Sequence, residues 1–432
     1  MPKKIAVIGG GFAGTMVVRQ LIDHGFQGNI VRFHDSTSLT RGPAYQENAS
    51  PLLLNVRSAN MSAFPDDPSH FVRFLEQNHS IHADPMQFVP RSIYGEYLEF
   101  IWAETLTLSH QKNIKLILRS DSDIEWEEFD SIVLATGNEL PRVPAETKEE
   151  KTWQSPIYQG NPWQLQLAEI DNQLPIFILG NGLTMVDTVL QLRNKGFQQK
   201  IIALSRHGYH MLAHAKEDAI HSIEKPIEKT DLSALLSYFN RKRKEMTIAD
   251  FLSFVDVHRP YFPIWWQGFT SEEKNDFLKH LRHIWGTIRH RIPEEIFLKI
   301  EQERTSTKLE VCSGKMIEFQ NKGTHAEIRY TSNGIEKTER FACLINCTGP
   351  ESDIHHMKNQ VLNELMQKNW IQSDELNQGI KINPNELKAV GYSPMNMYAL
   401  GNLCKGTFWE STAIREIRSQ AKLIAKSILA IE

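Results

Sequence analysis

Two stretches of this sequence follow the same plan of apolar strand, glycine-rich turn, helix and second apolar strand. In the first, an apolar run leads into Gly9-x-Gly11-x-x-Gly14, and the second run ends at Asp35, 21 residues after Gly14. In a dinucleotide-binding unit, such glycines allow a tight turn close to a pyrophosphate, and the acid accepts a hydrogen bond from a ribose hydroxyl. Residues 175–208 repeat the plan, so the sequence predicts two nucleotide-binding units in one chain.

The second unit departs from the first at two positions. Gly180 and Gly182 follow its strand, but Met185 stands where a third glycine is expected, and Arg206 stands 21 residues after Met185. The third glycine serves packing of the helix against the strand, so the turn itself remains able to form. Arg206 with Ser205 suits a 2′-phosphate, which favours NADPH over NADH. A retained fold with an empty or weak pocket is the alternative.

Other segments return the chain to the two predicted sheets. One apolar strand ends in Ala135-Thr136-Gly137 and another in Cys347-Thr348-Gly349, after the predicted β-meanders at 113–130 and 307–342. Gly401 follows a further strand, and a helix is expected from about Ser411. Its apolar stripe steps by three and four residues and comprises Ile414, Ile417, Ala421, Ile424 and Ile428.

We therefore expect an α/β fold with two Rossmann-like dinucleotide-binding domains. The first domain is predicted to comprise residues 1–165 and 341–432, and the NAD(P)H-binding domain residues 166–340. The second domain includes a predicted helical insert at 209–305. In that insert, Trp265, Trp266 and Phe269 fit either an ordinary core or an apolar substrate or partner surface.

Composition and cysteine content exclude several classes of protein. A net charge of −4 gives no basic footprint for nucleic acid, and no apolar run has the ~18 residues of a membrane span. The four cysteines lack a Cys-x-x-Cys pair, which argues against a disulfide framework, a zinc ribbon and disulfide reductase chemistry beside a flavin. The insert histidines lack carboxylates or cysteines at ligand spacing, so no metal is predicted. We expect a cytoplasmic protein.

Four segments carry a resemblance to a known group of flavoproteins. They are RGPAYQENASPLLLNV, GNGLTMVD, WGTIRHRIP and GTFWESTAIREIRSQA, spread over nearly the whole chain. With the two fingerprints, they resemble the two-dinucleotide-binding-domain flavoproteins, and within them the FAD/NAD(P)-binding group of YdhS-like proteins and nitrosuccinate-forming amino-acid N-monooxygenases.

The resemblance implies FAD in the first site and NADPH in the second. FAD would contact the first glycine turn and extend along residues 41–45 and 54–56. The helix after Ser411 would aim its N-terminus at the flavin pyrimidine edge, and Trp409 either covers the ring or packs in the core. The predicted cofactor-binding residues are Gly9, Gly11, Phe12, Ala13, Gly14, Asp35, Arg41, Tyr45, Asn55, Ala135, Thr136, Gly137, Gly180, Gly182, Leu183, Ser205, Arg206, Gly349, Gly401, Asn402 and Trp409.

Three functions are compatible with these features. The first is an NADPH-dependent FAD monooxygenase that uses O2 and a flavin hydroperoxide to oxygenate a small amine or amino-acid-like substrate. The second is an NADPH-dependent flavin reductase or dehydrogenase without oxygen transfer. The third is a non-catalytic flavin-binding sensor or partner protein whose second site has decayed. The sequence assigns no catalytic residue, substrate or oligomeric state.

Overall fold

The computed structural model describes residues 2–34, 39–46, 52–79, 83–120, 124–147, 155–215, 227 and 230–430. The first domain is built on a five-stranded sheet in the order β13-β4-β1-β2-β3, in which every pairing is parallel. Its strands are β1 (Lys4–Ile8), β2 (Asn29–Phe33), β3 (Lys115–Arg119), β4 (Ser131–Leu134) and β13 (Asn396–Ala399). The inner strands are buried and mostly apolar because helices cover both faces of a parallel sheet, and Arg32 of β2 is the buried charged exception.

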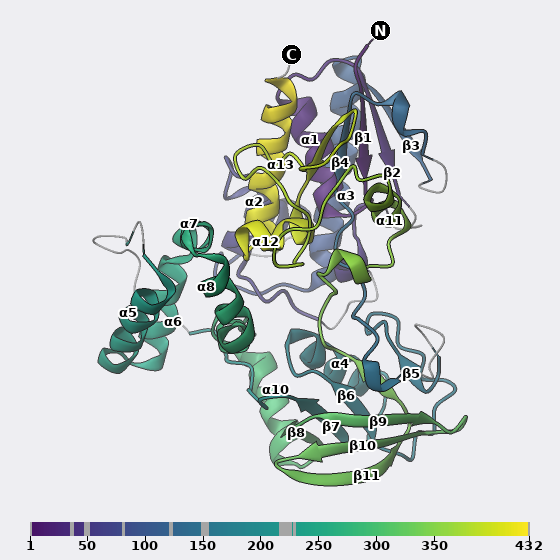
Figure 1. Ribbon diagram of the computed structural model, residues 1–432, viewed down its shortest axis with the longest axis vertical. Coiled ribbons are helices and arrows are strands. Elements are labelled where there is room, and N and C mark those ends of the chain that lie inside the picture. Colours follow the sequence, from purple (N-terminus) through teal and green to yellow (C-terminus); the bar gives the residue numbers. More distant parts are fainter. Residues whose placement is uncertain are drawn as a thin grey trace.

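Helices from both ends of the chain cover this first sheet (Figure 1). Helix α1 packs against α13 and against the long helix α3, so the first glycine turn and the C-terminal helix lie side by side. The helices of this domain are α1 (Phe12–Asp23), α2 (His70–His79), α3 (Arg91–Gln111), α11 (Gln360–Gln367), α12 (Lys405–Phe408) and α13 (Ile414–Leu429). The predicted apolar stripe of α13 faces the core, with Ile414, Ala421, Ile424 and Ile428 buried.

The segment 113–130 differs from its prediction as a β-meander. Strand β3 instead extends the parallel sheet, pairing with β2 from Asn29↔Lys115 to Phe33↔Arg119. A short 3-10 turn at Trp126–Glu128 then leads into β4. Strand β3, KLILR, is polar at both ends and partly exposed along its length, as expected of an edge strand of the sheet rather than of a separate hairpin.

The second domain has its own five-stranded parallel sheet in the order β5-β12-β6-β7-β8. Its strands are β5 (Tyr158–Gln159), β6 (Ile176–Leu179), β7 (Ile201–Ser205), β8 (Leu309–Ser313) and β12 (Leu344–Asn346), and its helices include α4 (Leu183–Asn194) and α10 (Glu294–Thr305). A three-stranded antiparallel sheet of β9 (Met316–Asn321), β10 (Ala326–Ser332) and β11 (Ile335–Phe341) packs against it. This confirms the second predicted meander from Met316 onward, whereas its first strand, β8, joins the parallel sheet instead.

Sheet membership shifts the domain boundaries by several residues. Strand β5 lies before residue 166 and β12 lies after residue 340, yet both pair within the second sheet. We therefore propose that the second domain begins near residue 155 and ends near residue 349, where the chain returns to the first domain.

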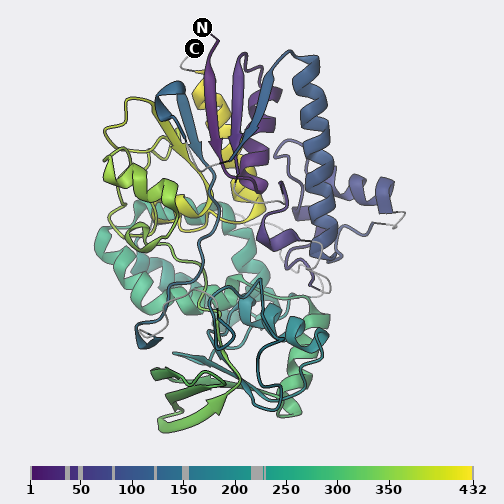
Figure 2. The same cartoon turned by 90° about the vertical axis from the view of Figure 1, so that its right-hand side faces the viewer.

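The helical insert leaves the second domain and lies beside the first (Figures 1 and 2). Its helices are α5 (Leu232–Glu245), α6 (Ile248–Val257), α7 (Phe262–Gly268), α8 (Ser271–Asp276) and α9 (Arg282–Arg289), with a π-helical turn at Phe277–Leu281. Trp265, Trp266 and Phe269 are buried in the aromatic core of the insert, so they pack its interior and do not form an open apolar surface. Part of this core rests on the first domain, because the indole N–H of Trp266 donates to the carbonyl of Gly406 at 2.8 Å.

Candidate functional site: two glycine turns and their surroundings

The first glycine turn has the conformation that its sequence predicts. Gly9 has φ +135°, and a Cβ there would lie 2.1 Å from the carbonyl oxygen of Ala135. Its N–H donates to the carbonyl of Phe33 at 2.9 Å. Gly11 is the N-cap of α1 and no side chain caps that end, so the first N–H groups of the helix can bind an anion.

A buried arginine lies behind this turn. Arg32 of β2 donates to the carbonyls of Gly9, Gly10 and Gly11 at 3.2, 2.7 and 3.1 Å and to the hydroxyl of Thr15 at 2.8 Å. Burial lowers the pKa of its guanidinium to about 9, which leaves it charged at neutral pH. Arg32 therefore fixes the shape of the turn and places a positive charge behind the predicted phosphate position.

The second glycine turn repeats the geometry of the first. Gly180 has φ +106°, its N–H donates to the carbonyl of Leu204 at 2.8 Å, and a Cβ there would lie 2.3 Å from the carbonyl oxygen of Cys347. Gly182 caps α4 with φ −83° and ψ −162°, against −85° and −164° for Gly11. The methionine that follows has not altered the turn.

Met185 is accommodated by a compensating change on the neighbouring strand. At the matching position of the first unit, a Cβ on Gly14 would lie 2.2 Å from the carbonyl oxygen of Gly9. Since Met185 has a Cβ, the first turn of α4 must lie farther from its strand than that of α1. The N–H of Gly9 donates to Phe33 and that of Gly180 donates to Leu204, so Phe33 and Leu204 occupy equivalent positions. The residues just before them, Arg32 and Ala203, are therefore equivalent as well. The large side chain thus comes from the strand in the first unit and from the helix in the second, where Met185 is 3% exposed.

The structure describes only one of the two residues that are predicted to lie near a nucleotide ribose. Asp35 lies outside the described residues. Arg206 is exposed beyond the end of β7, and its Nη2 lies 2.6 Å from Nε2 of His283 in the insert. The hydroxyl of Ser205 accepts from the N–H of Gly208 at 3.0 Å, so Ser205 also shapes the loop that carries Arg206.

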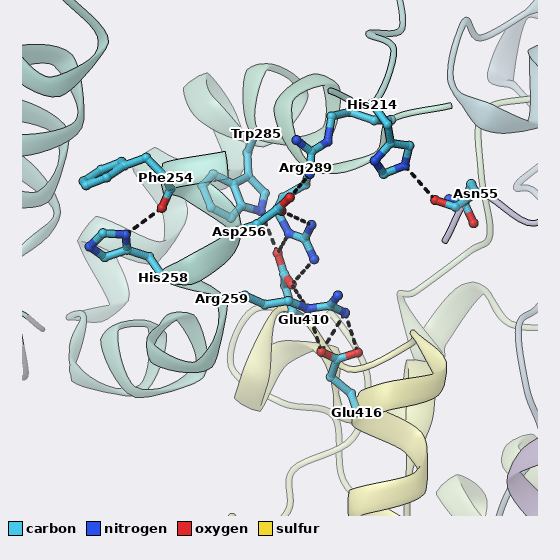
Figure 3. Close-up of polar contacts among 11 residues, drawn as sticks. Asn55, His214, Phe254, Asp256, His258, Arg259, Trp285, Arg289, Glu410 and Glu416 are labelled. Carbon is cyan, nitrogen blue, oxygen red and sulfur yellow. Dashed lines mark hydrogen bonds and ion pairs between the residues drawn. The ribbon is translucent and has the colours of Figure 1, made fainter. Parts of the chain in front are cut away.

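The predicted flavin-side loop is fixed to α3 by Arg41. Its guanidinium makes a two-point ion pair with Glu99 at 2.6 and 2.8 Å. The ring of Tyr45, at the end of this loop, is tilted against that of Tyr94 with 4.8 Å between the centroids, and burial raises the pKa of Tyr45 to about 12. The carbonyl of Asn55 accepts from Nε2 of His214 at 2.9 Å, which joins the first domain to the second (Figure 3).

Several buried hydroxyls around the first site have no hydrogen-bond partner among the residues that the structure describes. They are Oγ1 of Thr40, the hydroxyl of Tyr94, Oγ1 of Thr136 and Oγ of Ser411. Buried polar groups are normally satisfied, so these positions fit a polar ligand. Gly137 and Gly349 have φ +78° and +90°, and no described atom outside the adjoining residues lies within 4 Å of the position that a Cβ would take at either residue. A phosphate-binding helix end, a fixed turn and orphaned hydroxyls together suit FAD.

The C-terminal part of the site is built around Gly401. Its N–H donates to Gln420 at 2.8 Å, and Asn402 donates to the carbonyl of Glu351 at 3.2 Å. Helix α13 begins shortly afterwards at Ile414 with no side-chain cap, as the predicted role requires. The first residues of the glycine-turn helices, Phe12, Ala13 and Leu183, are partly or fully buried against their own cores.

Trp409 lies on the core of the insert. Its φ is +58°, and its ring centroid is 5.3 Å from that of Trp266 and 5.1 Å from that of Phe277. The ammonium of Lys405 lies 5.0 Å from the Trp409 ring. The indole therefore connects the insert to the segment before α13.

Ion pairs join the insert to this same segment (Figure 3). Arg289 binds Glu410 at 2.8 and 3.1 Å, and Arg259 binds Glu416 at 2.8 and 3.0 Å. Trp285 also donates to Glu410 at 3.2 Å. Burial would raise the pKa of Glu410, but the nearby arginines outweigh it and lower that pKa.

A buried ion pair connects the two domains directly. Arg91 at the start of α3 lies 2.9 Å from Asp187 of α4 and donates to the carbonyl of Leu53 at 3.0 Å. Burial raises the pKa of Asp187, and Arg91 partly opposes that shift. Sequence reasoning missed this pair and also Arg32. The available signal was a charged residue inside an apolar run, as in NIVRF and LTMVDTVL.

The four cysteines are free and buried. Burial raises the pKa of Cys343 and of Cys347 to about 12 and also raises those of Cys312 and Cys404. Such thiols are unreactive. Within the described residues, no group of three or more His, Cys, Asp or Glu side chains is placed to bind a metal, and none of the helices there is long and apolar enough to cross a membrane.

Comparisons with known proteins agree with this arrangement. Residues 6–139 match the FAD-NAD(P)-binding family. The chain is 24% identical over 218 residues to the uncharacterised protein YdhS of Escherichia coli K12, covering 44% of this chain and 39% of that protein. It is 20% identical over 221 residues to the flavin-containing monooxygenase ustF1 of Aspergillus flavus, covering 48% and 54%. The chain thus spans about half or less of these relatives.

A solved structure matches over the full length. The L-lysine 6-monooxygenase of Pseudomonas syringae superposes with a TM-score of 0.63 at 13% identity, covering 100% of both chains. At this identity the likeness shows the fold alone, an α/β fold with two Rossmann-like dinucleotide-binding domains. The predicted fold class is confirmed.

Proposed function

We propose that this chain is an FAD-dependent NADPH oxidoreductase, and that it is a monooxygenase acting on a small amine or amino-acid-like substrate. The observation that carries the proposal is a pair of intact glycine turns with matching geometry, the second followed by Arg206. The full-length likeness to a lysine 6-monooxygenase and the partial likeness to ustF1 support the choice of reaction class.

The residues around the first site suit a role in holding FAD. The turn at Gly9 and Gly11 would bind its pyrophosphate, with Arg32 behind it. The uncapped start of α13 at Ile414 would stabilise negative charge on the flavin ring. When bound, FAD accepts hydride from NADPH and activates O2 for transfer of one oxygen atom to the substrate nitrogen.

The second site would hold NADPH on the turn at Gly180 and Gly182, with Arg206 near the 2′-phosphate. The aromatic core of the insert, closed over Trp409, would keep water from that side of the site. The overall reaction consumes NADPH, a proton, O2 and the amine, and yields NADP+, water and a hydroxylated amine. The four free cysteines agree with the reducing environment of the cytoplasm, which we propose as the location.

A reductase without oxygen transfer is the second candidate. Bacillithiol disulfide reductase of Staphylococcus aureus shares the fold with a TM-score of 0.55 at 12% identity. The buried, unreactive cysteines of this chain disfavour thiol chemistry of its own, although reduction of a small-molecule acceptor remains compatible.

Product analysis tests this proposal. FAD-loaded protein would be supplied with NADPH, O2 and a panel of small amines and amino acids, and hydroxylated product and hydrogen peroxide would be measured against NADPH consumed. We expect at least one amine to give hydroxylated product in near-equal amount to NADPH. Peroxide or a reduced acceptor as the sole product with every amine would support the reductase. No NADPH consumption at all would support the sensor.

A further inference from the structure

Four basic residues from two distant segments meet beyond the end of β7. Arg206 and His207 follow that strand, whereas Arg282 and His283 begin α9 of the insert. Nε2 of His283 lies 2.6 Å from Nη2 of Arg206 and 3.2 Å from Nε of Arg282. The ring of His207 lies 5.3 Å from that of His283. We call these four residues the basic cluster.

The hydrogen bonds within the basic cluster fix the state of His283. Both arginines are donors only, so Nε2 of His283 must be the acceptor and Nδ1 must carry the proton. Burial, followed by the charges of Arg282 and Arg206, lowers the pKa of His283 to about 4. The imidazole is therefore neutral at pH 7, and the two guanidiniums carry the positive charge.

Neither Arg206 nor Arg282 forms an ion pair with a carboxylate within the described part of the chain. Other arginines do form such pairs, since Arg289 of the insert pairs with Glu410 and Arg304 of α10 pairs with Glu301. Two cations brought to one imidazole without a counter-ion repel each other, and an anion between them would remove that repulsion. The basic cluster is therefore suited to bind an anion between Arg206 and Arg282.

The backbone before Arg282 is also unusual. The π-helical turn at Phe277–Leu281 ends immediately before it, and such turns are frequent at functional sites. This turn changes the helical phase at the start of α9 and so determines how Arg282 and His283 face β7.

We propose that Arg282 and His283 complete the binding site for the 2′-phosphate of NADPH, so that the phosphate binds between Arg206 and Arg282. The inference rests on the proposed use of NADPH. It gives the insert a part in choosing the nucleotide, because NADH has no group to neutralise the two guanidiniums. Binding of NADPH would also tie the insert to the second domain through its phosphate.

Calorimetric titration of the FAD-loaded protein with 2′,5′-ADP and with 5′-AMP tests the proposal, because these ligands differ only in the 2′-phosphate. We expect Arg282→Gln to weaken binding of 2′,5′-ADP at least about tenfold and to leave 5′-AMP unchanged. Lys279→Gln is the matched control, since it removes one positive charge from an exposed position of the same segment. It should change neither affinity.

A kinetic readout covers the case in which 5′-AMP binds too weakly for calorimetry. In anaerobic flavin reduction, Arg282→Gln should raise the apparent Kd for NADPH, leave the limiting rate of reduction near wild type and leave the apparent Kd for NADH unchanged. His283→Gln should act in the same direction and less strongly.

Two results would overturn this inference without affecting the NADPH assignment. One is unchanged 2′,5′-ADP binding in Arg282→Gln while Arg206→Gln loses it, which leaves the proposed function intact. The other is an equal loss of both ligands in Arg282→Gln, which would indicate a structural role. Wild-type protein that does not prefer 2′,5′-ADP would remove the NADPH assignment and this inference together.

Discussion

The two nucleotide-binding units of this protein share one turn and differ in how they fill the space behind it. In the first unit, Gly14 on the helix is matched by Arg32 on the strand, and Arg32 binds the carbonyls of the turn. In the second unit, Met185 on the helix is matched by the small Ala203 on the strand. The large buried side chain therefore stands on the strand in the first unit and on the helix in the second.

This comparison shows what the third glycine of the fingerprint does. It sets the distance between helix and strand, and it need not be glycine where the opposite side chain is small. The turn at Gly180 keeps its hydrogen bond and positive φ despite Met185. Loss of that glycine is therefore weak evidence for loss of the nucleotide.

Exchanging the residues at this position should give the largest effect. Gly14→Met would place a Cβ 2.2 Å from a backbone carbonyl, so we expect protein that retains no FAD or does not fold. Met185→Ala should fold, with a loss of about 2–5 kcal/mol in the free energy of unfolding because a buried side chain is removed. FAD content and urea unfolding measure both. A Gly14→Met protein with full FAD content would contradict the account.

A second asymmetry lies two residues further along each helix. Met16 of α1 is apolar and buried, whereas its counterpart Asp187 in α4 pairs with Arg91. Arg91→Met would leave Asp187 buried without its partner and should cost about 3–5 kcal/mol of stability. The double variant Arg91→Met with Asp187→Leu should recover most of that loss in urea unfolding. A double variant as unstable as the single one would show that the charge of Asp187 is not the cause.

Arg32 has no counterpart in the second unit, so its removal should affect one nucleotide only. Arg32→Met leaves the carbonyls of Gly9 and Gly10 without their donor and should cost about 2–3 kcal/mol. We expect weaker FAD binding by fluorescence titration and unchanged affinity for 2′,5′-ADP. Equal weakening of both ligands would indicate a general loss of structure.

The contact between His214 and Asn55, which joins the two domains, predicts a pH dependence. Burial lowers the pKa of His214 from 6.5 to about 4 in the folded protein, so the unfolded chain takes up the proton first. The contribution of His214 to stability is therefore complete above pH 6.5 and is lost as the pH falls toward 4, by about 2 kcal/mol at pH 5.

His214→Gln keeps an N–H donor but does not titrate. Its free energy of unfolding should fall less between pH 7 and pH 5 than that of the wild type, as measured in urea at both values. Equal slopes in the two proteins would show that His214 titrates normally in the folded state.

Much of this molecule follows from its sequence, because strand, turn and helix are encoded locally. The glycine turns, the parallel strands and the start of α13 depend on residues close together in the chain. The first predicted meander was wrong because an edge strand such as β3 can join a parallel sheet or a hairpin with the same local pattern. The choice depends on what lies beside it.

The parts of the site that the sequence did not predict are contacts between residues far apart in the chain. Arg91 with Asp187, and Arg206 with His283, lie far apart in the sequence and meet only when the domains and the insert fold together. The substitution of Met185 for glycine was visible in the sequence. Its compensation by Ala203 required the alignment of the two strands, which the structure supplied.

We propose that the second unit is a working NADPH site. Anaerobic rapid mixing of the FAD-loaded protein with NADPH and, separately, with NADH measures this on the flavin itself, with loss of the flavin absorbance as the signal. We expect fast loss with NADPH and much slower loss with NADH at equal concentration. No loss with either nucleotide, even with candidate amines present, would contradict it and leave a fold whose second site no longer binds.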